Sequence, residues 1–388
     1  MAKTDLKFGK KLKEYGAIDF NACYNCGTCT AVCSLSTEED SFPREMVRLS
    51  VLGQSEDITA SLKPWLCYYC GDCTTNCPQE AKPAELMMSL RRWLTTRYDW
   101  TRLSSLFYRS LLGEIIGLLV IAGIILITWA SFFGLPTETS AMVLSDMVNP
   151  EKIHLIDMTV AIILSGLLIS FLLNMHYQII TKDKSIKVPL KLYFSQFGKL
   201  IFHFATQWRF SKCETKPESF IKRIKNGTFN YWIVHFIVMT SYAALFFMIM
   251  VFIGWFQTDG NAYSWFRLLM VYYTTAGLIL GTSYFIISRL RKKDVKSKFS
   301  HHSDWTFLIL LFLVAATGFI MHIANYTGAP VIVTFYLYLI HLLITIPMLI
   351  IEVPFSKWTH LAYRPIAIYL NEIKLAAKKD TIKQKSKK

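Results

Sequence analysis

The stretches CYNCGTCTAVC at residues 23–33 and CYYCGDCTTNCP at residues 67–78 decide the fold of the first part of this chain. In each stretch three cysteines stand at every third position, and a fourth follows four residues after the third. Three thiolates at this spacing can bind three corners of one 4Fe-4S cube, while the fourth reaches the cube held mainly by the other stretch. The two stretches therefore predict a helical unit with two 4Fe-4S clusters.

The expected ligation is crossed between the two stretches. The first cluster is assigned to Cys23, Cys26, Cys29 and Cys77, and the second cluster to Cys67, Cys70, Cys73 and Cys33. Structural zinc and disulfides are the alternatives. Zinc sites usually pair CxxC units across a longer stretch, and disulfides are rare in the cytoplasm. The ninth cysteine, Cys213, stands alone and is expected to be a small apolar side chain only.

Helical patterning surrounds the cysteines. Pro43 is expected to open a helix that runs to about Gly53, and Pro83 a second helix. We predict a helical double-cluster ferredoxin-like domain over residues 1–90. Residues 91–111 mix arginine with tryptophan and tyrosine, a composition suited to a linker in the membrane headgroup layer.

The remainder of the chain is strongly apolar. Across all 388 residues of the chain, 53% are hydrophobic and only 18% are charged, which leaves too little polar surface for an ordinary soluble protein. Runs long enough to cross a bilayer core of about 30 Å recur after residue 112. We predict an all-α protein whose residues 112–365 form a six-helix transmembrane bundle, with spans at Leu112–Phe133, Ile153–His176, Asn230–Phe256, Trp265–Arg289, Asp304–Ala324 and Val331–Val353.

The charge distribution predicts the orientation. Lysine and arginine number 42 against 27 acidic residues, an excess that in a soluble protein would suggest nucleic-acid binding. Apart from Lys152 and Arg267, all of these cations precede residue 113, lie in the loops 176–230 and 289–304, or follow Val353. Alternating spans place these segments on one side. The positive-inside rule therefore predicts cytoplasmic termini, with the lipid bilayer and not nucleic acid as partner.

Two further segments are expected on the cytoplasmic side. Residues 186–210 alternate apolar side chains with lysines, which predicts an amphipathic helix lying flat on the membrane surface. Residues 366–388 form a basic tail, which is expected to be disordered after Leu375.

Histidines within or beside apolar spans are candidate haem ligands. On a continuous last helix the 19 residues between His341 and His360 would separate the two imidazoles by about 28 Å, enough for one haem near each membrane face. Matching depths pair His235 with His360 at an inner haem b, and His322 with His341 at an outer haem b. A protein with one haem, or with His154 as the outer ligand, would also fit. Solvated or interfacial roles are expected for His154, His176, His203, His301 and His302.

The segment PFSKWTH at residues 354–360, with a histidine one span earlier, resembles the gamma subunit of respiratory nitrate reductase, a cytochrome b. In that family two histidines of the last helix ligate two haems, and their partner ligands stand ten residues apart on an earlier helix. His235 matches the first partner, whereas Leu245 stands at the position of the second.

The whole chain resembles the C subunit of the quinone-interacting membrane-bound oxidoreductase (Qmo), which joins heterodisulfide reductase C and E subunits in one polypeptide. The stretches HHSDWTF, TGFIMHI and HLAYRP carry this similarity in the membrane part. The resemblance implies a bacterial or archaeal cytoplasmic membrane. It also implies electron transfer from menaquinol, through haem b and the clusters, to two flavin-containing subunits of the Qmo A and B type that serve adenylylsulfate reductase.

The residues alone lead to a similar interpretation. Clusters in a cytoplasmic unit and haem-competent histidines across a bilayer predict a redox conduit, and the mobile redox carrier of a bilayer is a quinone. The chain lacks a dinucleotide-binding GxGxxG element and a phosphate-binding loop, so terminal catalysis is expected in partner subunits. The alternatives are the membrane cytochrome of a sulfite-reduction or heterodisulfide-reductase-type complex, and a haem-free membrane sensor or scaffold.

Overall fold

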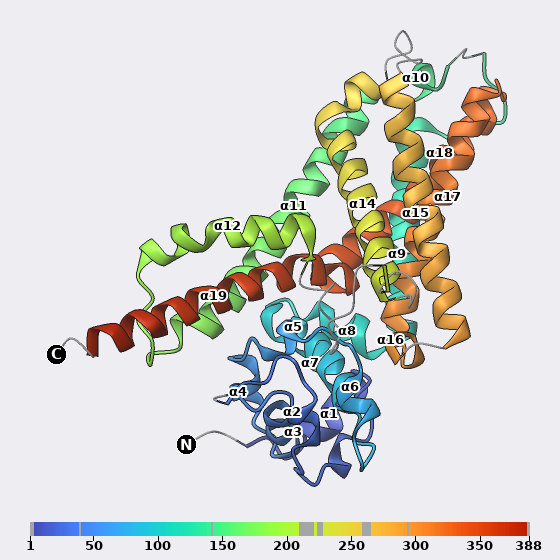
Figure 1. Cartoon of the computed structure of the whole chain (residues 1–388). Helices are drawn as coiled ribbons and strands as arrows, with labels where there is room; N and C mark the ends of the chain where they lie inside the picture. The colour runs from blue at the N-terminus through green and yellow to red at the C-terminus, as the bar shows by residue number, and fades with distance from the viewer. Residues whose placement is uncertain are drawn as a thin grey trace.

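The computed structural model describes residues 4–38, 40–140, 143–208, 221–222, 228–257, 265–292 and 295–385. Within these ranges every regular element is a helix, apart from one isolated bridge between Thr37 and Asp40, which confirms the all-α prediction. A unit of short helices from the first hundred residues lies at one end of a bundle of long helices (Figure 1).

The amino-terminal unit is built around one longer helix, α7, on which the shorter helices pack. Pro43 directly precedes α3 and Pro83 begins α7, as the sequence predicts. The apolar core between them includes the fully buried Met46, Leu86 and Leu90. The helices of this unit are α1 (Phe8–Glu14), η1 (Phe20–Ala22), α2 (Thr28–Ala31), α3 (Arg44–Val51), α4 (Ser55–Thr59), α5 (Lys63–Leu66), α6 (Asp72–Thr75) and α7 (Pro83–Tyr98).

The first half of the expected headgroup linker is buried against the amino-terminal unit, whereas Trp100, Leu103 and Leu106 of its second half are exposed. The first half is the end of α7, where Trp93 and Tyr98 are 6% and 0% exposed because they pack into the amino-terminal core. Asp99 then accepts hydrogen bonds from the backbone of residues 101, 102 and 104, which fixes the turn into α8 (Leu103–Arg109). The segment therefore joins the two parts of the protein rigidly.

Among the described residues, six helices are long and apolar enough to cross a membrane, which confirms the predicted spans to within a few residues. Many of their large apolar side chains face outward, such as Leu119 at 66% and Ile127 at 69% exposure, which suits a surface covered by lipid. The helices are α9 (Leu111–Phe133), α11 (Pro150–His176), α14 (Thr228–Gln257), α15 (Trp265–Arg291), α17 (His302–Tyr326) and α18 (Val331–Phe355), with the short α10 (Leu144–Met147) and α16 (Val295–Lys298) between them.

The last span does not continue to His360, contrary to the expectation of one long helix. Pro354 lies in the last turn of α18, where it cannot donate a backbone hydrogen bond. Ser356 then leaves the helical conformation, with φ −130° and ψ −145°. After the short η5 (Lys357–Thr359) a new helix, α19 (His360–Lys385), begins at His360 itself.

The basic tail is helical as far as Lys385, contrary to the disorder expected after Leu375. Leu370, Ile373 and Ala377 of α19 are buried because this helix lies beside α12 (Leu190–Thr206), the amphipathic helix predicted at residues 186–210 (Figure 1). The Tyr369 hydroxyl donates to the carbonyl oxygen of Tyr193 at 2.7 Å. Apolar side chains of α12 stay exposed, as expected of a helix at a membrane surface, among them Leu190, Phe194, Phe197, Ile201 and Phe204.

Candidate redox site

The two cysteine stretches fold into the same local structure. Gly27 and Gly71 precede α2 and α6 with φ of 91° and 93°, a left-handed conformation that a side chain would strain. Two residues earlier, Asn25 and Tyr69 also have positive φ, 60° and 61°. The backbone therefore adopts the same conformation around the thiols in both stretches.

Backbone N–H groups donate hydrogen bonds to cysteine sulfur atoms of both stretches. The N–H of Asn25 donates to Sγ of Cys23 at 3.3 Å, and that of Tyr69 to Sγ of Cys67 at 3.4 Å. The N–H of Ala81 donates to Sγ of Cys77 at 3.4 Å. Such donors stabilise negative charge on cluster sulfurs and tune the reduction potential.

Cys33 lies among the cysteines of the other stretch, as the crossed ligation requires. Burial raises the pKa of the Cys33 thiol to about 11, and the neighbouring Cys67 and Cys70 add to the rise. Burial also raises the pKa of Cys73, with further contributions from Cys67, Cys70 and Cys33. Iron would have to displace protons from these thiols on binding. The donor set fits the second 4Fe-4S cluster.

The first group of cysteines is more open. Cys29 is buried near Cys23 and Cys26, whereas Cys26 is exposed. The Thr28 hydroxyl 3.4 Å from its sulfur lowers the pKa of Cys26. No recorded contact joins Cys77 to this group within the described chain, so its place in the first cluster stays a prediction. Cys213 lies outside the described residues.

No three His, Cys, Asp or Glu side chains in the described ranges form a site for a single metal ion. A 4Fe-4S cube, in contrast, holds its four thiolates further apart than one ion does, because each thiolate binds a different iron. Cys29 and Cys73, from the two stretches, pack in one small apolar cluster with Ala84. The two cysteine groups are therefore neighbours.

The second cysteine stretch contacts the membrane part directly. Nη2 of Arg364 donates to the carbonyl oxygen of Cys67 at 2.9 Å, and the buried Arg91 donates to the same oxygen. Arg364 lies one turn after His360 on α19. The contact therefore places a candidate cluster ligand beside the helix turn that carries a candidate haem ligand.

The structure brings His235 and His360 together. Their ring centres are 6.4 Å apart, on α14 and α19. An imidazole nitrogen binds a metal at about 2 Å, so two axial imidazoles on one metal hold their ring centres roughly 6 Å apart. Nδ1 of His360 donates to the carbonyl oxygen of Lys357, which leaves Nε2 for a metal. Burial holds the pKa of His360 well below its usual value, so the ring is neutral, as ligation requires.

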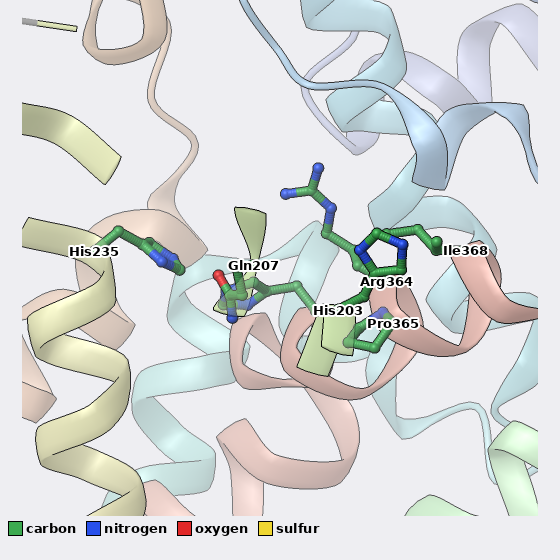
Figure 2. A pocket seen from close by; sticks show the side chains of 7 residues that line it. His203, Gln207, His235, Arg364, Pro365 and Ile368 are labelled. Atoms are coloured by element: carbon green, nitrogen blue, oxygen red, sulfur yellow. The ribbon is translucent and has the colours of Figure 1, made fainter. Parts of the chain in front are cut away.

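A small pocket adjoins this pair. Figure 2 shows His235 reaching toward it from one side, with Arg364, Pro365 and Ile368 on the other. His203 and Gln207 complete the lining together with His360. The pocket and the two imidazoles lie at the end of the bundle next to the cysteine unit.

The second predicted pair is not brought into contact. Nδ1 of His341 lies 2.9 Å from the Thr317 hydroxyl, and its Nε2 lies 3.4 Å from that of Thr345. The His322 ring packs on Tyr272, whose hydroxyl is 3.4 Å from Nε2. Across the described helices no recorded contact joins His322 to His341. The outer haem therefore stays a prediction.

Two buried acidic residues in the membrane-capable helices are further functional candidates. Glu114 and Glu352 lie inside apolar spans and are 0% and 1% exposed. The signal for them is an acidic residue in the stretches LLGEIIG and LIIEVPF, where an ionisable group is costly and therefore a functional candidate. Histidine patterning alone misses both.

Comparison with known proteins identifies the amino-terminal unit. Residues 22–82 match the model of a 4Fe-4S dicluster domain. A protein of Archaeoglobus profundus that is named for its likeness to the C subunit of heterodisulfide reductase is 30% identical over 88 residues, which cover 22% of this chain and 47% of that protein. The C subunit of the H2:CoB-CoM heterodisulfide,ferredoxin reductase of Methanothermobacter thermautotrophicus is 28% identical over 87 residues, with the same two coverages.

A third relative is the C subunit of the ferredoxin:CoB-CoM heterodisulfide reductase of Methanosarcina acetivorans, 29% identical over 108 residues, which cover 28% of this chain and 42% of that protein. The chain thus spans about half, or less, of the curated relatives it matches. No solved structure matches. The amino-terminal unit is an iron–sulfur domain related to these proteins, and it is joined to six membrane-capable helices.

Proposed function

We propose that this chain is a membrane electron-transfer subunit that connects menaquinol and menaquinone in the bilayer with cytoplasmic partner subunits. Its cofactors are haem b and two 4Fe-4S clusters. The contact between Arg364 and the carbonyl oxygen of Cys67 carries this proposal. It joins the helix turn after His360 to the second cysteine stretch, so the two candidate redox centres are neighbours.

The contacts between the histidine pair and the two cysteine groups set the order of the proposed electron route. His235 and His360 would hold the inner haem, and the second cysteine group, which Arg364 contacts at Cys67, would be next in the route. The first cysteine group would follow, because Cys29 and Cys73 pack together. The first cluster meets the partner protein, because Cys26 is exposed at the surface of the unit.

The chain's own residues orient and tune these centres. When bound, haem supplies the one-electron step. The Lys357 carbonyl holds the His360 ring in one tautomer and one orientation. Arg91 and Arg364 place two positive charges at the Cys67 carbonyl, which favours the reduced, more negative state of the adjoining cluster.

A second haem b, with His341 and His322, is part of the same proposal. It would take His322 away from Tyr272 and His341 away from its two threonine hydroxyls. Gly318 of α17 faces the His341 ring, because a side-chain carbon at this position would lie 3.4 Å from Cε1 of His341. This haem would lie toward the face opposite the cysteine unit.

The partners are proposed from the resemblance to the C subunit of Qmo. They are two flavin- and iron–sulfur-containing subunits of the A and B type, with adenylylsulfate reductase as the indirect acceptor. The basic loops and the even number of spans support cytoplasmic termini in a bacterial or archaeal membrane. A subunit of a heterodisulfide-reductase-type complex is the second candidate, because the relatives are named as subunits of such complexes.

The test follows electrons from quinol to the clusters in the full chain, purified without oxygen. A reduced menaquinone analogue is mixed with wild type, His360→Ala and the control His176→Ala, whose ring bonds Tyr193 and no proposed cofactor. We expect haem and then cluster reduction in wild type and control, and no cluster reduction in His360→Ala, with its non-haem iron content unchanged. Cluster reduction at the wild-type rate in His360→Ala would overturn the route.

A further inference from the structure

Glu114 and Glu352 meet at the end of the bundle that faces the cysteine unit. Glu114 lies in the first turn of α9, and Glu352 in the last turn of α18. Both side chains are buried. A buried ionised carboxylate is very costly unless a cation or several hydrogen bonds compensate it. The state of this pair therefore depends on what surrounds it.

The two carboxyl groups lie close together, because Glu114 bonds the Ser356 hydroxyl and Glu352 bonds the N–H of the next residue, Lys357. Glu114 accepts from the Thr306 hydroxyl at 3.0 Å and from the Ser356 hydroxyl at 3.4 Å. Glu352 accepts from the Lys357 N–H at 2.9 Å, while its other oxygen, Oε1, has no hydrogen-bond donor from the rest of the described chain. Two carboxylates in contact repel each other, whereas one proton between them forms a strong hydrogen bond.

The nearby cations are already engaged elsewhere. Arg92 of α7 forms a salt bridge with Asp304 at 3.1 Å, and the ammonium of Lys357 bonds the other oxygen of Asp304. Arg289 of α15 donates to Ser300 at 2.7 Å. Arg92 and Lys357 thus bond Asp304, and among the described residues no Lys or Arg side-chain nitrogen lies within 4 Å of a Glu114 or Glu352 oxygen. A proton is therefore the most direct way to reduce the charge of the glutamate pair.

His302 connects this pair to the surface. Its Nε2 lies 3.9 Å from Oε2 of Glu114 and donates to the carbonyl oxygen of Phe107 at 2.9 Å. The His302 side chain is 20% exposed. It is also the one ionisable base within 4 Å of the pair among the residues that the structure describes.

We propose that Glu114 and Glu352 form a proton-binding site, which holds one shared proton at rest and exchanges protons with the aqueous phase through His302. The exchange is a proton transfer only, so the pair changes its net charge by one for each proton. A second proton makes the pair neutral.

The site is linked to the candidate haem ligand through one residue. The N–H of Lys357 donates to Glu352, and the carbonyl of Lys357 accepts from His360. An electron that arrives at the inner haem adds negative charge at this end of the bundle. Uptake of the second proton by the pair compensates that charge. The compensation of charge at the inner haem rests on the proposed function, whereas the existence of the shared proton does not.

Infrared spectroscopy of the full chain in lipid nanodiscs tests the shared proton. The readout is the C=O stretching band of a protonated carboxyl group, identified by its shift in D2O at neutral pH. We expect the band in wild type and in the control Glu151→Gln, an exposed acid of α11, and its loss in Glu114→Gln/Glu352→Gln. Equal bands in wild type and the double variant would overturn the site.

His302→Gln tests the route, because glutamine keeps an N–H donor for the Phe107 carbonyl but cannot titrate. We expect an unchanged band whose hydrogen–deuterium exchange is slowed by roughly tenfold or more, as for loss of a proton-transfer group. Exchange at the wild-type rate would overturn the route through His302.

The redox link is tested in reduced-minus-oxidised spectra of the same samples. We expect the protonated-carboxyl signal to grow on reduction in wild type, and no such change in the double variant. A static band without redox dependence would overturn the link alone. Failure of quinol to reduce the clusters in wild type would overturn the proposed function instead and leave the proton site standing.

Discussion

Asp304→Asn is expected to loosen the attachment of the cysteine unit to the membrane bundle. Asp304 is 5% exposed and bonds both Arg92, which is 6% exposed, and Lys357. Arg92 comes from α7, and its Nη1 donates to the carbonyl oxygen of Tyr15 at 2.9 Å. The Asp304 carboxylate thus connects a helix of the amino-terminal unit with two elements of the bundle.

The size of the effect follows from what remains after the substitution. Asparagine leaves the buried Arg92 and the half-buried Lys357 facing each other without a carboxylate, and breaking a buried pair in this way costs about 3–5 kcal/mol. Arg92→Ala is expected to cost less, about 1.5–3 kcal/mol, because Lys357 still compensates Asp304. The matched control is Lys11→Ala, which removes a 2.7 Å pair with Asp5 whose side chains are 52% and 29% exposed. Exposed pairs contribute about 0–1 kcal/mol.

The assay is unfolding of the full chain in mild detergent by titration with a denaturing detergent, followed by tryptophan fluorescence and by protease cleavage of the amino-terminal unit. The expected order of destabilisation is Asp304→Asn, then Arg92→Ala, then Lys11→Ala. Because the two sites touch, Arg92→Ala and Asp304→Asn should not be additive in the double variant. Additive effects, or an Asp304→Asn loss no larger than that of Lys11→Ala, would refute the reasoning.

Four further outcomes are expected. The reconstituted full chain should carry about eight non-haem irons, counted apart from haem iron, because crossed ligation uses all eight thiolates of the two stretches, and Cys213→Ser should leave that count unchanged while Cys67→Ser lowers it; stoichiometric zinc would contradict the assignment. A reporter that is active only outside the cytoplasm should give no signal when fused after Lys388, and a strong signal would contradict the six-span orientation. His341→Ala should remove one haem, measured by the pyridine haemochrome, and spare the haem of His235 and His360; an unchanged haem content would contradict the two-haem assignment. Burial, then Arg92 and His302, lower the pKa of His301 from 6.5 to about 2. Between these two pH values the unfolded chain binds more protons than the folded chain, so the free energy of unfolding should fall as the pH drops below 6.5. A His301→Asn variant should flatten this part of the profile of stability against pH, and a profile identical to that of wild type would contradict the reasoning.

Local sequence determined much of this protein. The two cysteine spacings predicted the iron–sulfur unit, because cluster ligation depends on which thiols a short loop can bring together. Six apolar runs predicted six membrane-capable helices, since length and hydropathy alone decide whether a helix can cross a bilayer. The meeting of His235 and His360 was also expected, from their matching depths in the bundle.

Tertiary structure decided the rest. The chain turns at Ser356, so His360 starts a new helix instead of extending the last span, and the basic tail is helical because α12 covers its apolar side chains. The Arg364 contact with Cys67 and the pairing of Glu114 with Glu352 join residues far apart in the sequence. Hydropathy patterns record which residues avoid water, but not which neighbour each one meets. Those neighbours are fixed only when the helices pack, and they set the charge and the hydrogen bonds of every buried ionisable group.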